Sequence, residues 1–86
     1  MTPTSEVQRT FLIEIQDEAE AVLRVLGAFA LGGARLTGLD LRPQADNGLR
    51  LQVTAANLDE PRSASIAQRL GALPIVRAVS FGWRST

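Results

Sequence analysis

The 86-residue sequence contains no cysteine, no histidine and no lysine. Without cysteine there is no disulfide and no thiolate chemistry, and without histidine there is no imidazole for acid–base catalysis. The usual ligands of a tetrahedral zinc site are missing for the same reason. Because every basic residue is arginine, Schiff-base chemistry on lysine is excluded as well. We therefore expect a protein that is not an enzyme and that has no catalytic residues, no metal and no cofactor.

The sequence also has no excess of charge of either sign. Nine arginines balance nine acidic residues, so no net field draws the protein toward nucleic acid or an anionic membrane. No apolar run is long enough to span a membrane, and residues 1–8 lack the apolar core of a signal peptide. We expect a cytoplasmic location. A domain this small without disulfide or metal often gains stability from a partner, which predicts a homodimer or higher oligomer.

The first half of the sequence changes from a strand pattern to a helix pattern. Residues 9–16 alternate as in a half-buried strand. Residues 18–31 instead carry apolar residues at helical spacing, and Gly32-Gly33 ends the predicted helix. The predicted inward faces consist of Phe11, Ile13 and Ile15 in the strand and of Val22, Val25, Leu26 and Phe29 in the helix.

The second half returns to strands around one more helix. Strands are predicted over 34–43, with Pro43 as its end, and over 49–55. Asp46-Asn47-Gly48 is a turn signal that makes these two strands a hairpin. The internal Gly38 marks a bulge or a close backbone approach.

A second helix begins near Asp59, and a last strand covers 75–83. Which face of this last strand is buried stays open, because Arg77 interrupts the apolar set Val79, Phe81 and Trp83.

This order of elements, strand-helix-strand-strand-helix-strand, is typical of the ferredoxin-like α+β fold. Right-handed crossovers then place both helices on one face of a four-stranded antiparallel sheet with strand order 4-1-3-2. We expect one domain over residues 9–83, a flexible arm over 1–8 and a short tail over 84–86.

Three acidic residues stand between the first strand and the first helix. Asp17 occupies the position of a helix N-cap, and Glu18 and Glu20 fall in the first turn, where carboxylates favour the helix dipole. Helix capping and ligand binding both explain this cluster.

The outer side of the first helix carries only one pair of charges, Glu20 and Arg24. The rest of this side is a candidate contact patch for another subunit, formed by Leu23, Gly27, Ala28 and Leu31. Single exposed leucines are also ordinary on protein surfaces, so both readings stay open.

The sequence resembles the ACT domain, a small amino-acid-sensing module. The residues that carry the resemblance are the run Arg24-Val25-Leu26-Gly27-Ala28-Phe29 followed by Gly33, Leu36, Gly38, Leu39 and Leu41. In these residues the chain is most similar to the regulatory small subunit of acetolactate synthase. The resemblance implies a non-catalytic regulatory or assembly subunit that dimerises by edge strands or by its first helix and acts on a catalytic partner in branched-chain amino-acid biosynthesis. A stand-alone amino-acid sensor is the alternative.

In that family the effector binds at an interface between two domains, on the loop before the first helix. The resemblance assigns effector binding to Asp17, Glu18, Ala19 and Glu20 and to Leu36, Thr37 and Gly38. Asp17 replaces the family's Asn and Glu20 replaces its Gly, and the added negative charge disfavours a carboxylate guest at short range.

Overall fold

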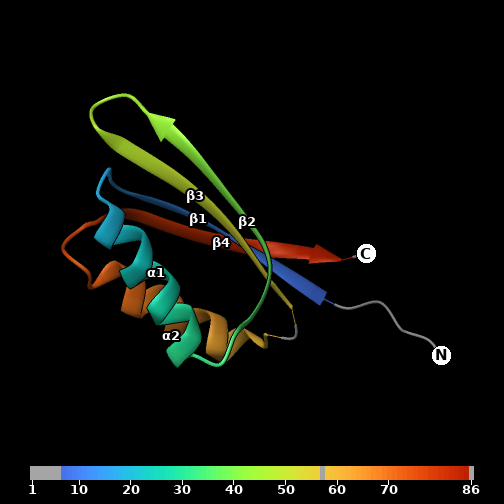
Figure 1. Ribbon diagram of the computed structural model, residues 1–86. Coiled ribbons are helices and arrows are strands. Elements are labelled where there is room, and N and C mark those ends of the chain that lie inside the picture. Colours follow the sequence, from blue (N-terminus) through green and yellow to red (C-terminus); the bar gives the residue numbers. More distant parts are fainter. Residues whose placement is uncertain (1–6, 57, 86) are drawn as a thin grey trace.

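The computed structural model describes residues 7–56 and 58–85. Along the chain lie β1 (Val7–Gln16), α1 (Ala19–Leu31), β2 (Arg35–Gln44), β3 (Gly48–Ala56), α2 (Glu60–Gly71) and β4 (Val76–Ser85). The four strands form one antiparallel sheet in the order β2-β3-β1-β4. Both helices cover the same face of this sheet (Figure 1). The ferredoxin-like fold with its strand order is therefore confirmed.

The strands at the two ends of the chain extend beyond the domain limits expected from the sequence. β1 begins at Val7 and β4 continues to Ser85, so parts of the expected arm and tail belong to the sheet. The remainder of the arm, residues 1–6, and the last residue of the tail lie outside the described residues.

The core lies between the sheet and the helices and is centred on Phe11. The ring of Phe11 meets Phe29 of α1 edge-on at 4.9 Å between centroids and stacks on Phe81 of β4 at 5.3 Å. One layer of aromatic contacts thus joins β1, α1 and β4. The inward side chains of β1 predicted from the alternation are all fully buried, and so are Leu51 and Val53 of β3.

A bulge in β4 settles which face of this strand is buried. Ile15 pairs with Val76, but Glu14 pairs with Ala78, so Arg77 is the extra residue. After the bulge Phe81 points toward the helices and packs against the core, while the exposed Arg77 lies outside the alternation. The break that Arg77 makes in the apolar alternation of the last strand is therefore this bulge.

β2 is an edge strand with its own bulge. The pairing with β3 shifts between Leu36 and Gly38, which confirms the irregularity predicted at Gly38. Pro43 does not end the strand, which continues to Gln44. That prediction was wrong because an edge strand tolerates a residue without an N–H on its free side.

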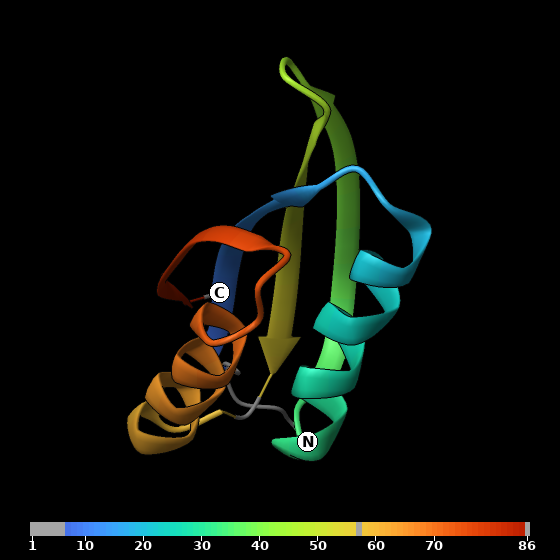
Figure 2. The same ribbon diagram turned by 90° about the vertical axis from the view of Figure 1, so that its left-hand side faces the viewer.

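The hairpin between β2 and β3 extends past the helix layer (Figure 2). Asp46 and Asn47 take left-handed backbone angles in its turn, with φ values of 62° and 55°. These are the angles that Asn and Asp tolerate best among residues with a side chain, so the turn signal is confirmed. None of the helices in the described residues is long and apolar enough to cross a membrane.

Candidate functional site

The four effector residues predicted around the start of α1 are all exposed: Asp17 and Glu18 lie in the β1–α1 loop, and Ala19 and Glu20 in the first turn of the helix. The N-cap residue is Glu18, and its side chain makes no capping hydrogen bond. The prediction that Asp17 caps the helix was wrong, because the Asp17 backbone N–H donates to the Asn47 carbonyl at 2.9 Å and ties this residue to the β2–β3 turn. Neither loop carboxylate covers the positive end of α1, which therefore stays open to an anionic group.

A polar hollow of about 290 Å³ lies beside this loop. Its wall includes Asp17, Glu18 and Asn47, and its cationic member is Arg77 from the bulge of β4. The Arg77 Nη2 donates to the Asp46 carbonyl at 3.3 Å, which holds the guanidinium over the turn.

Gly48 makes room for this arginine. A Cβ on Gly48 would lie 3.0 Å from Nη1 of Arg77, so a side chain at this position would require the guanidinium to shift by a few tenths of an ångström. Sequence reasoning missed Arg77 as a site residue. Its one signal was the broken alternation of the last strand.

The charges in the hollow are not satisfied by one another. Arg77 forms no ion pair within the part of the chain that the structure describes, and neither Asp17 nor Glu18 does. One guanidinium and two carboxylates therefore face the same exposed space. This arrangement can hold a molecule that carries an anionic and a cationic group close together.

The second predicted half of the effector site, Leu36, Thr37 and Gly38, lies at the opposite end of the protomer. β2 begins only after α1 has run back along the sheet (Figure 1). The 13 residues of α1 span about 20 Å at 1.5 Å per residue. Thr37 is the bulged residue, and its hydroxyl donates to the Thr54 carbonyl at 3.3 Å. A single protomer therefore does not bring the two halves together.

The outer face of α1 carries the two most exposed large apolar side chains of the described residues. Leu23 is 69% exposed and Leu31 is 76% exposed. Gly27 lies midway between them, and a Cβ there would meet nothing within 4 Å. Ala28, which the sequence placed in the same contact patch, is only 8% exposed and belongs to the core.

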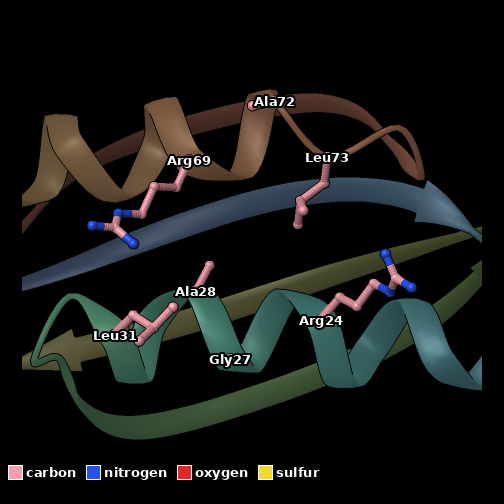
Figure 3. A pocket seen from close by; sticks show the side chains of 7 residues that line it. All are labelled: Arg24, Gly27, Ala28, Leu31, Arg69, Ala72 and Leu73. Carbon is pink, nitrogen blue, oxygen red and sulfur yellow. The ribbon is translucent and has the colours of Figure 1, made fainter.

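An apolar groove of about 440 Å³ separates α1 from α2 (Figure 3). Gly27 and Ala28 line it on the α1 side, and Leu73 points into it from the turn that follows α2. Arg24 and Arg69 lie toward its two ends, and Leu31 lies toward the same end as Arg69 (Figure 3). The groove is therefore apolar along its length and cationic at both ends.

The two arginines differ in their partners. Arg24 pairs with Glu20 one turn away at 3.5 Å. Arg69 makes no ion pair within residues 7–56 and 58–85.

Elsewhere the described surface carries exposed leucines and further ion pairs, among them Arg50 with Glu14 at 3.3 Å. Leu36, Leu39 and Leu41 of the edge strand β2 are exposed. Arg42 Nε donates to Asp40 at 2.9 Å, and this hydrogen bond raises the pKa of the Arg42 guanidinium. Both groups are exposed, so the pair has little weight for stability. Across the described residues no group of three or more acidic side chains is placed to hold a metal ion.

Comparison with known proteins points to one fold. No family model matches the chain, and no curated protein matches it in sequence. The ACT domain of GTP pyrophosphokinase from Chlorobium tepidum superposes with a TM-score of 0.76 at 10% identity, over 90% of this chain and 99% of that domain. The C-terminal domain of MgtC from Mycobacterium tuberculosis superposes with a TM-score of 0.78 at 12% identity, over 98% of this chain and 94% of that domain.

A third similar structure is an uncharacterized protein from Thermotoga maritima, with a TM-score of 0.68 at 14% identity over 93% of this chain and 98% of that one. The chain thus has the fold of ACT domains. At these identities the likeness concerns the fold alone, and the resemblance to the acetolactate synthase small subunit stays a prediction.

Proposed function

We propose that this chain is a non-catalytic regulatory domain that binds a small amino acid in the hollow between the β1–α1 loop and Arg77. The observation that carries the proposal is the meeting of one guanidinium and two carboxylates beside the start of α1, where Glu18 makes no side-chain capping bond. None of the three groups has an ion-pair partner among the residues that the structure describes. The fold is shared with an ACT domain, which favours a regulatory role over a catalytic one.

The charges suit a zwitterion better than a simple anion. A free carboxylic acid gains from Arg77 but is repelled by Asp17 and Glu18, which line the same space. An α-amino acid carries an ammonium group next to its carboxylate, so it can satisfy both signs at once. The acidic loop, which disfavours a plain carboxylate, is then the part of the site that selects for the ammonium group.

The second half of the predicted site contributes only if another subunit supplies it. Leu36, Thr37 and Gly38 lie about one helix length, roughly 20 Å, from the loop of their own protomer. An assembly of two or more copies would allow one copy's segment to approach the other copy's loop. The hollow beside the loop is formed entirely by residues of one protomer.

The test is a thermal-shift screen against the proteinogenic amino acids, followed by calorimetric titration of any amino acid that raises the melting temperature. The N-acetyl and amide derivatives of that amino acid should each bind more weakly than the amino acid itself, because the first lacks the ammonium charge and the second lacks the carboxylate charge. Arg77→Gln should lower the affinity roughly 10- to 100-fold, as expected for a lost charge-assisted hydrogen bond. Arg42→Gln, on the open face of the sheet, is the matched control and should bind normally. A flat screen, or unchanged affinity in Arg77→Gln, would contradict the proposal.

A second candidate is an assembly subunit for a biosynthetic enzyme, as the resemblance to the acetolactate synthase small subunit implies. The exposed leucines on α1 and β2 favour it, because they are available to a catalytic partner. Purified acetolactate synthase catalytic subunit should change in activity or feedback inhibition when this chain is added. No change at saturating concentrations would remove this candidate and leave the amino-acid sensor.

A further inference from the structure

We infer that the groove between α1 and α2 binds a free carboxylate with an apolar chain of medium length, whose carboxylate lies at Arg69 and whose chain runs past Gly27 toward Leu73. This site goes beyond the ligand-binding proposal, because the groove shares no lining residue with the hollow at Arg77 and takes an apolar anion rather than a zwitterion. Three features of the groove carry the inference: its lining, its length and the uneven distribution of charge along it.

The lining of the groove suits an apolar chain. Its volume of about 440 Å³ lies within the range of small-molecule pockets. Gly27 widens it, since a Cβ there would meet nothing within 4 Å, and Ala28 and Ala72 are small as well. Among the described lining residues only Arg24 and Arg69 have polar side chains, and none is acidic. A polar ligand would therefore lose its hydrogen bonds to water along most of the groove, whereas an alkyl chain loses none.

The length of the groove limits the length of that chain. Along α1 the lining extends from Arg24 to Leu31, which is seven residues or roughly 10 Å of helix axis. A zigzag chain of carbon–carbon bonds, each about 1.5 Å long, reaches this length with about eight carbons. The end of a longer chain would stay in water. The expected occupant is therefore a medium-chain carboxylate and not a long-chain lipid.

The charges at the two ends of the groove differ, and this gives the ligand its direction. The charge of Arg24 is already countered by Glu20, whose carboxylate lies 3.5 Å away. Arg69 forms no ion pair among the described residues, and its guanidinium lies toward the Leu31 end (Figure 3). A carboxylate therefore gains more at Arg69 than at Arg24.

Arg62 adds a second positive charge just past the Arg69 end. It precedes Arg69 by seven residues, so the two lie on the same side of α2. Its Nη2 lies 3.0 Å from the position that a Cβ on Gly33 would take, directly after α1, and it forms no ion pair within the described chain. The carbonyls of residues 28–30 already accept the N–H groups of residues 32–34, which weakens the negative end of the α1 dipole. This end of the groove is therefore the anionic subsite.

Calorimetric titration of the whole chain with straight-chain carboxylates from butyrate to myristate, each below its micelle concentration, is the first test. The affinity should rise about two- to fourfold with each methylene group. The rise should stop at about eight to ten carbons, where the chain fills the groove. Octanol should bind roughly three- to tenfold more weakly than octanoate, because it cannot pair with Arg69.

Four variants test the two parts of the site. Arg69→Gln should weaken octanoate binding roughly three- to tenfold and leave octanol binding unchanged, whereas Arg24→Gln at the other end is the matched control and should change octanoate binding less than about twofold. Gly27→Leu should weaken both ligands at least tenfold, because its side chain enters the groove. Gly71→Leu is the control for this change, since that helical position also has nothing within 4 Å and does not line the groove. Circular dichroism verifies that the variants fold.

Several results would overturn the inference. They are an affinity that does not depend on chain length, binding that survives Gly27→Leu, and equal binding of octanoate and octanol. Light scattering of the same samples identifies another occupant: a dimer that Gly27→Leu dissociates, with no binding of any carboxylate, would assign the groove to a second copy. Flotation with anionic phosphatidylglycerol vesicles, without binding of the monomeric carboxylates, would assign it to a membrane surface.

The test separates this site from the amino-acid site. Arg77→Gln should bind octanoate with the affinity of the wild-type protein, because Arg77 does not line the groove. Loss of octanoate binding in Arg77→Gln would move the carboxylate to the loop hollow and refute the groove. Either outcome leaves the amino-acid screen to be decided by its own result, so the two proposals fail independently.

Discussion

Gly32 controls how closely the end of α1 approaches α2. A Cβ at this position would lie 2.5 Å from Cγ1 and 2.7 Å from Cδ1 of Ile66, a residue of α2 that is 1% exposed. Carbon atoms prefer about 3.5–4.0 Å, so Gly32→Ala must push the helices or the Ile66 side chain apart by roughly 1 Å. The backbone itself accepts alanine, because φ at Gly32 is −80°. The cost is therefore one of packing, and overpacked cores lose typically 1–3 kcal/mol.

For a domain of this size, each 1 kcal/mol lowers the melting temperature by about 4–8 °C. We expect Gly32→Ala to melt roughly 10 °C below wild type when followed by circular dichroism. Gly71→Ala, which gains a methyl group in open space, should be at least as stable as wild type.

The penalty should also shrink in an Ile66→Val background, where one of the two clashing atoms is gone. Equal melting temperatures for Gly32→Ala and Gly71→Ala would refute the reasoning. A penalty that is unchanged by Ile66→Val would refute the assignment to this contact.

Two further predictions concern stability. Asp59→Ala should cost about 1 kcal/mol of unfolding free energy, because the Asp59 carboxylate accepts the Arg62 backbone N–H at 2.8 Å. Glu18→Ala should change the unfolding free energy by less than about 0.5 kcal/mol, because the Glu18 side chain makes no capping hydrogen bond. Urea denaturation measures both variants, and equal costs would contradict the assignment of Asp59 as a cap. Phe11→Ala should cost about 3–5 kcal/mol, because the ring is fully buried between two other aromatic rings. Phe81→Ala should cost less in the same assay, since Phe81 is only partly buried, and the reverse order would count against this view of the core.

The fold was predictable because its signals are local and periodic. The alternation in β1 and β3, the helical spacing in α1 and the Asp46-Asn47 turn each report on a few neighbouring residues. Sequence reasoning also placed Asp59 near the start of α2, where it proves to be the N-cap. These signals agree with one another, which is why the order of elements followed correctly.

The errors arise where a distant segment decides a local outcome. Asp17 fails to cap α1 because the Asn47 carbonyl, thirty residues away, binds its N–H. Ala28 is 8% exposed and belongs, with Ala21, to the core cluster in which α1 packs against the rest of the chain. A helical wheel centred on the larger apolar residues assigns Ala28 to the wrong side.

Sequence reasoning missed Arg77 at the candidate site for the same reason, because a distant segment decides where this side chain lies. Arg77 reaches the loop hollow only through the β4 bulge, and a bulge is a property of the pairing between two strands. Arg9 is a second example, since the alternation of β1 puts it on the core side without saying how a charge is accommodated there. In the structure its Nε donates to the Leu58 carbonyl at 3.1 Å, and its guanidinium carbon lies 6.0 Å from the centre of the Phe81 ring.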